Sequence, residues 1–83
     1  MTDVELNRLR WRCQRGMLEL DHILGGFLDG AYRDADAEAR AAFADLLALE
    51  DVEILDLIVG QAAPDSAAQD RLLRLMLPSR RAQ

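Results

Sequence analysis

The stretch MLELDHILGGFLDGAY, residues 17–32, carries the hydrophobic pattern that decides the fold. Its apolar side chains recur at three- and four-residue steps and therefore share one face of a helix: Met17, Leu20, Leu24, Phe27, Leu28 and Ala31. The opposite face holds Glu19, His22, Gly26 and Asp29. This pattern predicts a core-facing helix from Met17 to about Tyr32. Glycine lowers helix propensity, so Gly25, Gly26 and Gly30 predict a bend or fraying near its far end.

The same periodicity predicts a helix over residues 3–14, where Leu6, Leu9 and Cys13 share a face and Trp11 falls on the other side. Three further helices follow from capping residues and helix-stop signals. Their predicted ranges are 36–49 with an N-cap at Asp36, 51–60 with Asp51 as cap and Gly60 as stop, and 66–77 with a capping box of Ser66 and Gln69 before Pro78.

No segment alternates with the two-residue period of a strand, and no internal repeat is visible. The sequence therefore predicts an all-α fold, a compact bundle of five short helices. The bundle is expected to form a single domain over residues 1–78. Residues 79–83 are expected to form a flexible C-terminal tail.

Composition excludes several classes of protein. The chain has 83 residues, 51% of them hydrophobic, and a net charge of −5. A domain this small leaves little volume for a deep substrate cleft. An acidic chain also lacks the basic footprint of a nucleic-acid binder. The longest strongly apolar run, residues 57–59, is too short to insert into a membrane, and a single cysteine without a secretory signal is typical of a cytoplasmic protein.

Catalytic and metal chemistry have little support in the residues. A nucleophile–base pair would have to combine Cys13 with His22, and a cysteine on an apolar helix face is usually a small core residue. Zinc needs several histidine or cysteine ligands, and the chain has one of each. The acids at 34, 36 and 38 resemble the start of a calcium loop, but Ala39 stands where that loop needs glycine, so a helix N-terminus is the better interpretation. We predict no catalytic residue and no metal site.

The N-terminal segment differs from the rest of the chain in charge. Residues 1–15 carry four arginines against two acids, for +2, and the remaining residues carry −7. Helical spacing predicts a guanidinium stripe of Arg8, Arg12 and Arg15, with Trp11 beside it and Gly16 at its end. Arginine and tryptophan are enriched at interface hot spots, and glycine permits close backbone approach. The segment therefore indicates a surface that recognises another protein.

A purely structural interpretation of this segment also stays open. A charged stripe commonly faces water, and Arg15 and Glu19 have the spacing of an i,i+4 ion pair within a helix. Gly16 could serve only to join two helices. Trp11 could fill a secondary core, which the sequence alone favours because large aromatic side chains are mostly buried.

The string WRCQRGMLELD, residues 11–21, resembles the R-G-x-x-E signature region of the succinate dehydrogenase flavinylation factor family. The resemblance covers most of the chain, with matching features at Phe27, Tyr32, Phe43, Leu46, Leu47, Asp51 and Pro64. Two positions depart from the family pattern. Gln14 stands where many members have arginine, which softens the basic surface, and Leu57 replaces a tryptophan of some members as a core exchange.

The resemblance implies a five-helix assembly factor that acts as a chaperone and not as an enzyme. It implies binding to the flavoprotein subunit of succinate dehydrogenase, and in bacteria often of fumarate reductase, with promotion of covalent FAD attachment to a histidine of that client. Arg15, Gly16 and Glu19 match the contact motif, and we add Arg8 and Trp11 as flanking contacts because of their helical side. FAD then belongs to the client and is not bound tightly by this chain. We expect a monomer in the bacterial cytoplasm.

Two alternatives come from other classes of protein. One is an antitoxin-like regulatory module, a role also assigned to members of this family, which would bind a toxin or membrane protein and leave flavinylation unaffected. The other is a small flavin-binding enzyme, which would hold FAD tightly and show the absorbance bands of a flavin. Flavinylation of a client and the colour of the purified protein separate the three hypotheses.

Overall fold

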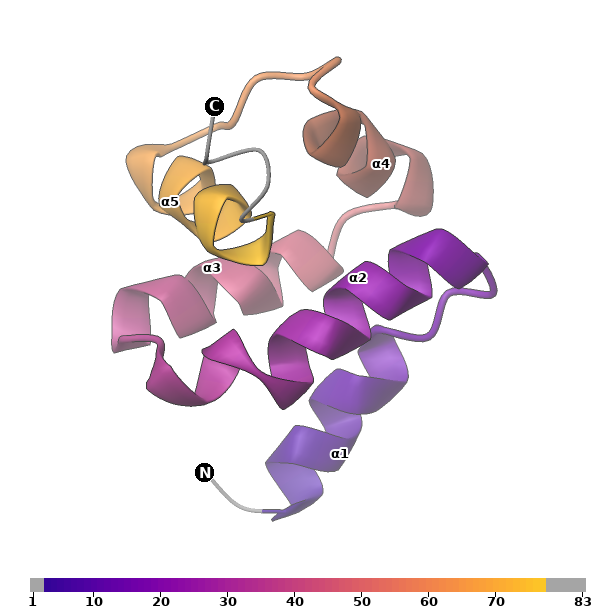
Figure 1. Ribbon diagram of the computed structural model, residues 1–83, viewed down its shortest axis with the longest axis vertical. Coiled ribbons are helices and arrows are strands. Elements are labelled where there is room, and N and C mark those ends of the chain that lie inside the picture. Colours follow the sequence, from indigo (N-terminus) through magenta and orange to yellow (C-terminus); the bar gives the residue numbers. More distant parts are fainter. Residues whose placement is uncertain (1–2, 78–83) are drawn as a thin grey trace.

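The computed structural model describes residues 3–77 and contains, over that range, five α-helices, one short 3₁₀ helix and no strand (Figure 1). The elements are α1 (Asp3–Arg12), α2 (Leu18–Asp29), η1 (Ala31–Asp34), α3 (Ala37–Leu47), α4 (Asp51–Val59) and α5 (Ala67–Met76). The predicted all-α, five-helix fold is confirmed. Residue 78 and the predicted flexible tail 79–83 lie outside the described residues, so the domain boundary stays a prediction.

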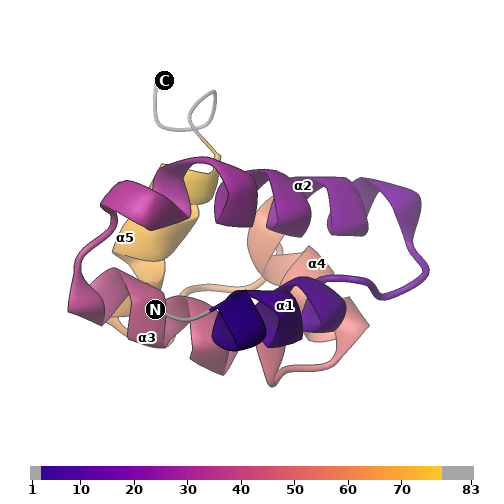
Figure 2. The same cartoon turned by 90° about the horizontal axis from the view of Figure 1, so that it is seen from below.

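The helices pack as a small globule with principal extents of 34 × 28 × 21 Å. In Figure 1, α2 and α3 cross the middle of the molecule, with α1 on one side and α4 and α5 on the other. The perpendicular view in Figure 2 shows α2 in a layer facing α1 and α3. Helix α5 packs against both α3 and α2, and α1 packs against α2. Helix α2 is therefore the central element that connects the N-terminal helix to the rest of the core.

The core is built mainly from the apolar faces that the periodicity predicts, and folding removes the apolar surface of these side chains from water; Ala31, predicted on the same face, is exposed at the start of η1. Its buried members include Leu20, Leu24, Phe27, Leu28, Phe43, Leu46, Leu47, Ile54, Leu57, Leu72, Leu73 and Met76. Three aromatic rings meet at its centre: the Phe27 and Phe43 centroids are 4.9 Å apart, and the Tyr32 centroid lies 5.7 Å from that of Phe43. The burial of Leu57 confirms its interpretation as a core residue.

The end of α2 differs from the prediction of a helix to Tyr32. The helix ends at Asp29, and Gly30 adopts φ −117° and ψ −97°, outside the helical region. The chain then forms η1, which carries Tyr32 into the core. The Arg40 guanidinium lies 5.1 Å from the centre of the Tyr32 ring and its Nε donates to the Tyr32 carbonyl at 3.2 Å. Long-range packing of Tyr32 thus takes precedence over continued helix.

The predicted helix boundaries at Asp36, Ser66 and Gly60 are confirmed. The Ala39 amide donates to the Asp36 carboxylate at 2.9 Å, and the Gln69 amide donates to the Ser66 hydroxyl at 3.1 Å. The Gln69 side chain completes the second cap one residue earlier than a standard capping box, because its Oε1 accepts from the Asp65 amide at 2.7 Å. Gly60 ends α4 in the left-handed conformation at φ +85°.

The prediction that Asp51 caps α4 is wrong. The capping position belongs to the preceding Glu50, whose side chain makes no capping hydrogen bond, and Asp51 is the first residue of the helix. Its carboxylate is engaged elsewhere, by the guanidinium of Arg15 at 3.0 Å. A long-range ion pair therefore replaces the local cap that the sequence suggested.

Helix α1 packs with Leu6 and Leu9 half-buried and with Cys13, just beyond its end, buried at 2% exposure. This confirms the predicted apolar face. An ion pair of 2.7 Å between Arg10 and Asp29 also connects α1 to the far end of α2. The helix ends at Arg12, two residues before the predicted limit, and that early end reshapes the segment that follows.

Candidate protein-binding surface

Residues 13–17 form a turn between α1 and α2, which we call the Gly16 turn. Gly16 has φ +78°, in the left-handed region that side chains with a Cβ rarely adopt. A Cβ built on Gly16 would meet no heavy atom within 4 Å. The backbone conformation, and not crowding by this chain, therefore requires glycine at this position, and the space above it is open to a partner.

The carboxylate of Asp21, in the first turns of α2, closes the Gly16 turn. Its Oδ1 accepts from the Arg15 amide at 2.7 Å and its Oδ2 accepts from the Gly16 amide at 3.1 Å. Two successive backbone N–H groups thus converge on one ionised side chain, an arrangement whose charge-assisted hydrogen bonds are stronger than neutral ones. The turn is fixed to α2 by this carboxylate.

The Arg15 side chain points inward, toward the connection between α3 and α4. Its Nη1 donates to the Leu49 carbonyl at 2.9 Å and to Asp51 at 3.0 Å, and its Nη2 donates to the Leu47 carbonyl. Its Nε donates to the carbonyl of Arg12 at 2.9 Å, and only 14% of the side chain is exposed. Arg15 therefore joins two connections that are far apart in the sequence.

Two predictions about Arg15 are wrong for one reason. The stripe of Arg8, Arg12 and Arg15 assumes a helix through residue 15, and the i,i+4 pair assumes a helix from Arg15 to Glu19, but residues 13–17 form a turn and α2 begins only at Leu18. Helix α1 ends at Arg12, so the spacing does not apply. The guanidinium instead forms an ion pair with Asp51. It also donates to a carbonyl at the C-terminus of α3 that has no partner within the helix.

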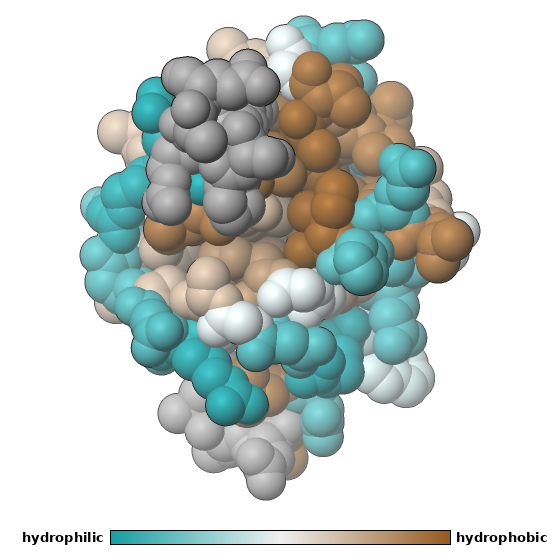
Figure 3. Space-filling model, viewed as in Figure 1, coloured by the Kyte–Doolittle hydropathy of each residue, from teal (hydrophilic) through white to brown (hydrophobic). Residues whose placement is uncertain are grey.

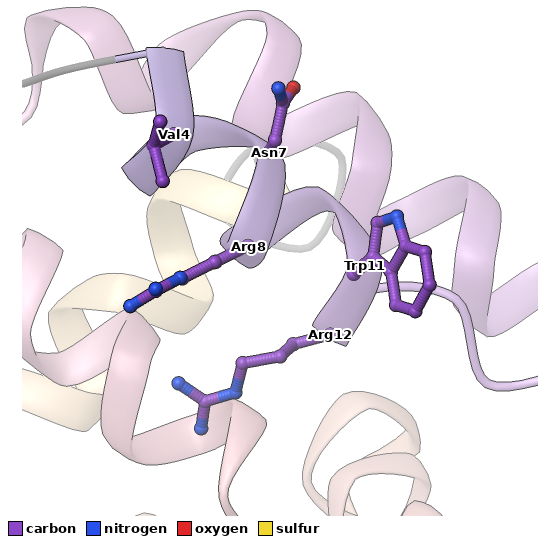
Figure 4. A pocket seen from close by; sticks show the side chains of 5 residues that line it. All are labelled: Val4, Asn7, Arg8, Trp11 and Arg12. Atoms are coloured by element: carbon purple, nitrogen blue, oxygen red, sulfur yellow. The ribbon is translucent and has the colours of Figure 1, made fainter.

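Arg8 and Trp11 remain together on the exposed face of α1. Trp11 is 79% exposed and Val4 is 61% exposed, and they line a shallow depression with Asn7, Arg8 and Arg12. Figure 4 shows Arg8 and Arg12 extending from the same side of α1, with Trp11 standing out near the end of the helix. The suggestion that Trp11 fills a secondary core is wrong, because its side chain is exposed and no other element within residues 3–77 covers it.

Charge on this face is concentrated at two arginines. Arg12 donates at 3.4 Å to the carbonyl of Ala44 on α3, and the structure gives neither Arg8 nor Arg12 an ion pair within residues 3–77. Arg10 and Arg15, in contrast, are neutralised by Asp29 and Asp51. The positive charge available to a partner therefore comes from Arg8 and Arg12.

Glu19 lies in the first turn of α2 with an exposed side chain, and within residues 3–77 its carboxylate has no hydrogen-bond or ion-pair partner. The preceding Leu18 is 86% exposed and Met17 is 37% exposed. The prediction that Met17 belongs to the buried face of α2 is wrong, since it precedes the helix at the capping position. Leu18 was missed by the sequence analysis, although a large apolar residue outside the apolar face of its helix is a recognisable signal.

Shallow depressions flank the Gly16 turn on both sides. One lies toward α2 and is lined by Arg10, Cys13, Gln14, Gly16, Leu18, Asp21, His22 and Gly25. The other lies toward the α3–α4 connection and is lined by Trp11, Arg12, Gln14, Arg15 and residues 47–51. The turn thus projects between two hollows, and a partner that contacts Gly16 would also cover Trp11 on one side and Leu18 on the other.

Apolar side chains are also exposed on α4. Val52 and Val59 are both 62% exposed and, seven residues apart, share one face of that helix. Figure 3 shows apolar surface gathered in the part of this view beside α4. Val52 directly follows Asp51, so this face begins where Arg15 joins the turn to α4.

Cys13 and His22 both line the depression toward α2, but they do not form an activated pair. Burial raises the pKa of the Cys13 thiol to about 11, against the opposing effect of the nearby Arg15 and Arg10 charges. The thiol is therefore protonated at neutral pH and is a poor nucleophile. Among residues 3–77, no group of histidine, cysteine and acidic side chains is arranged to hold a metal ion.

Comparison with known proteins assigns the chain to a family. A family model described as the flavinator of succinate dehydrogenase matches residues 7–79. The chain belongs to this family. It is 44% identical over 61 residues to the FAD assembly factor SdhE of Methylococcus capsulatus, covering 74% of each chain. It is 39% identical over 75 residues to the protein of that name from Pseudomonas aeruginosa, covering 90% of this chain and 89% of the relative.

Similarity reaches more distant members of the family as well. The FAD assembly factor SdhE of Coxiella burnetii is 33% identical over 67 residues, covering 81% of this chain and 82% of the relative. No solved structure matches the chain at a significant level. The family membership inferred from the R-G-x-x-E motif is confirmed. Within residues 3–77 of this family member, no helix has the length and apolarity needed to cross a bilayer.

Proposed function

We propose that this chain is an FAD assembly factor that binds the flavoprotein subunit of succinate dehydrogenase, of fumarate reductase, or of both. In this proposal it promotes the covalent attachment of FAD to a histidine of the client. Membership of the flavinator family supports the proposal. Relatives named FAD assembly factor SdhE, which are similar to this chain over most of their length, support it as well. We further propose that the chain works as a monomer in the bacterial cytoplasm.

The observation that carries this proposal is the exposed surface around the Gly16 turn. Trp11, Leu18 and Glu19 stand out from the two helices that the turn joins, and the described residues provide only shallow depressions beside them. Solvent-exposed tryptophan and leucine side chains on a small domain are typical of a binding surface for another protein. Such a surface suits a factor whose client supplies the reacting groups.

The proposed contacts have distinct chemical roles. Gly16 lets the client backbone approach closely, because it presents no side chain. Trp11 gives a large, stiff apolar contact, and Arg8 adds a positive charge beside it. Glu19 offers a carboxylate with no partner among the described residues of this chain. Arg15, whose guanidinium is engaged internally, supports the surface through the Gly16 turn.

The proposed mechanism assigns the covalent step to the client. Both reacting groups, the histidine and the bound FAD, belong to the flavoprotein, so the factor needs only to hold them in a productive arrangement. Holding reacting groups in position raises the rate of a reaction without any catalytic side chain from the helper. FAD is accordingly a ligand of the client, and the purified factor is expected to be colourless.

Reconstitution tests this function directly. Flavoprotein subunit produced in cells lacking the factor is mixed with FAD, with and without an equimolar amount of this chain, and covalent flavin fluorescence is followed on denaturing gels. We expect faster and more complete labelling with the chain present, and no stimulation by a Gly16→Leu variant. Equal labelling in the presence and absence of the wild-type chain would refute the proposal and favour a regulatory role unrelated to flavinylation.

A further inference from the structure

Two acidic side chains outside the R-G-x-x-E motif hold that motif in place. Asp21 accepts hydrogen bonds from the backbone amides of Arg15 and Gly16, at 2.7 and 3.1 Å. Asp51 accepts from the Arg15 guanidinium at 3.0 Å. One carboxylate therefore holds the backbone of the motif, and the other holds its arginine side chain.

The Gly16 turn needs such restraint because glycine is conformationally permissive. Glycine populates positive and negative φ with similar ease, so φ +78° at Gly16 is one of several accessible states. Residues 14–17 belong to no helix, and Met17 makes no side-chain capping hydrogen bond to α2. The Asp21 carboxylate satisfies two successive amides at once, which is possible only when both point to the same side of the turn.

Arg15 extends this restraint to the other half of the molecule. Its guanidinium binds the carbonyls of Leu47 and Leu49, which flank the end of α3, as well as Asp51 at the start of α4. A planar guanidinium with five donors can span these acceptors, whereas an ammonium group cannot. The position of the Gly16 turn is thereby coupled to the α3–α4 connection.

We infer that Asp21 and Asp51 are positioning residues for client recognition, and that Arg15 acts through the Gly16 turn instead of by touching the client. This inference rests on the proposed function. The carboxylates preorganise the turn, so the client does not have to order it on binding. Loss of either carboxylate weakens client binding because the turn loses its restraint, although both side chains lie at the edges of the depressions beside the turn and are engaged by Arg15 and Gly16.

Isosteric substitutions give the sharpest variants. Asp21→Asn keeps the size of the side chain but replaces one acceptor oxygen with an NH₂ group, so it cannot offer each amide its own acceptor oxygen as the carboxylate does. Asp51→Asn removes the charge opposite Arg15, while the carbonyls of residues 12, 47 and 49 remain as acceptors. Asp70→Asn is the matched control, because it removes an exposed i,i+4 ion pair with Arg74 on α5.

The first experiment measures the affinity of each variant for the purified flavoprotein subunit, with each value corrected for the folded fraction from urea unfolding. We expect Kd to rise about 10-fold for Asp21→Asn and about 3-fold for Asp51→Asn, with no change for Asp70→Asn. Arg15→Lys should also raise Kd about 3-fold, because a lysine can retain the ion pair with Asp51 but loses the set of carbonyl contacts that Asp51→Asn leaves in place.

The second experiment needs no client. Amide hydrogen exchange of the isolated chain should accelerate selectively at Gly16 in Asp21→Asn, while amides of α3 and α5 exchange as in the wild type. A purely structural effect would instead accelerate exchange throughout the core. Unchanged exchange at Gly16 would overturn the assignment of Asp21.

The binding results separate this inference from the proposed function. If the wild-type chain does not bind the flavoprotein, both the proposed function and the positioning roles fall. If the wild type binds, Trp11→Ala binds weakly, and Asp21→Asn and Asp51→Asn bind as tightly as the wild type, the proposed function stands and the positioning roles are overturned. Weakened binding by both asparagine variants, with the Asp70→Asn control unaffected, supports them.

Discussion

Two glycines of the described chain have the same left-handed backbone and different surroundings. Gly60, at φ +85°, follows α4 within a closure made by backbone groups alone: the amides of residues 60, 61 and 62 all donate to the Asp56 carbonyl. Gly16, at φ +78°, lies in a turn restrained by the Asp21 carboxylate and by Arg15, which reaches residues 32 to 36 positions away. One glycine ends a helix, and the other is held in place by tertiary structure.

The difference shows how the same conformation can serve two purposes. A local closure such as that at Gly60 needs only its own segment, so it can form as soon as the helix does. The Gly16 turn depends on α2, α3 and α4 being packed already. We therefore expect substitutions at the two positions to have similar effects on stability, whereas only those at Gly16 should weaken client binding.

The largest effect is expected from Gly16→Leu compared with Gly60→Leu. Each variant forces a side chain into the left-handed region and should lower the free energy of unfolding by about 1–2 kcal/mol. Only Gly16→Leu should abolish binding to the flavoprotein, because its side chain occupies the space above the turn. Far-UV circular dichroism checks that both variants stay helical. Co-purification of Gly16→Leu with the client at the wild-type level would contradict this assignment.

The next effect concerns the long-range restraint that distinguishes the two turns. Arg15→Ala leaves the carbonyls of Leu47 and Leu49 and the carboxylate of Asp51 without their donor. We expect the free energy of unfolding to fall by about 1–2 kcal/mol, since these partly buried acceptors lose a charged donor and water replaces it only in part. Urea unfolding measures the change. The exposed Arg8→Ala serves as control and should stay within about 0.5 kcal/mol of the wild type.

Exposed contacts at the Gly16 turn should show the converse behaviour. Trp11→Ala and Glu19→Ala remove side chains that the fold does not bury, so stability should change by less than about 0.5 kcal/mol. Client binding should weaken by about 2 kcal/mol for Trp11, the size of an interface hot spot. Isothermal titration with the flavoprotein provides the measurement. A Trp11 variant that unfolds easily but binds normally would place this side chain in the core after all.

The smallest expected effect is a pH dependence of stability that reports the burial of Cys13 at the start of the Gly16 turn. Burial raises the pKa of Cys13 from 9.0 to about 11, so the folded chain keeps a proton that the unfolded chain loses. Stability from this group is complete below pH 9 and is lost as pH rises toward 11. We expect about 1 kcal/mol less stability at pH 10 than at pH 8. Urea unfolding of the wild type and of Cys13→Ala, each at pH 8 and pH 10, isolates this contribution. An equal loss of stability between the two pH values in both proteins would rule it out.

Local signals predict much of the fold. Asp36 and Ser66 begin helices where their side chains can cap, Gly60 ends one, and the periodicity from Leu20 to Leu28 identifies the central face. Each of these features depends on residues within a few positions of one another. For this reason they can be inferred without knowledge of how the helices pack.

The features that sequence reasoning missed depend on partners distant in the chain. The sequence suggests that Asp51 caps a helix, but its carboxylate forms an ion pair with Arg15. Tyr32 continues the helical pattern of the sequence, but it lies in a 3₁₀ helix in which its ring packs against Phe43 in the core. The exposure of Trp11 likewise depends on which elements fail to cover α1, and no periodicity encodes that. The candidate surface was therefore located by its motif, while the inward role of Arg15 required the structure.

The central claim, that this chain promotes flavinylation of a dehydrogenase client through the Gly16 turn, is tested most directly in the cell. The gene is deleted, and covalent flavin fluorescence of the dehydrogenase flavoprotein is measured on a denaturing gel, with complementation by the wild type, Gly16→Leu and Gly60→Leu. We predict that deletion removes most of the fluorescence and that the wild type and Gly60→Leu restore it while Gly16→Leu does not. Undiminished fluorescence in the deletion strain would contradict a role of this chain in flavinylation.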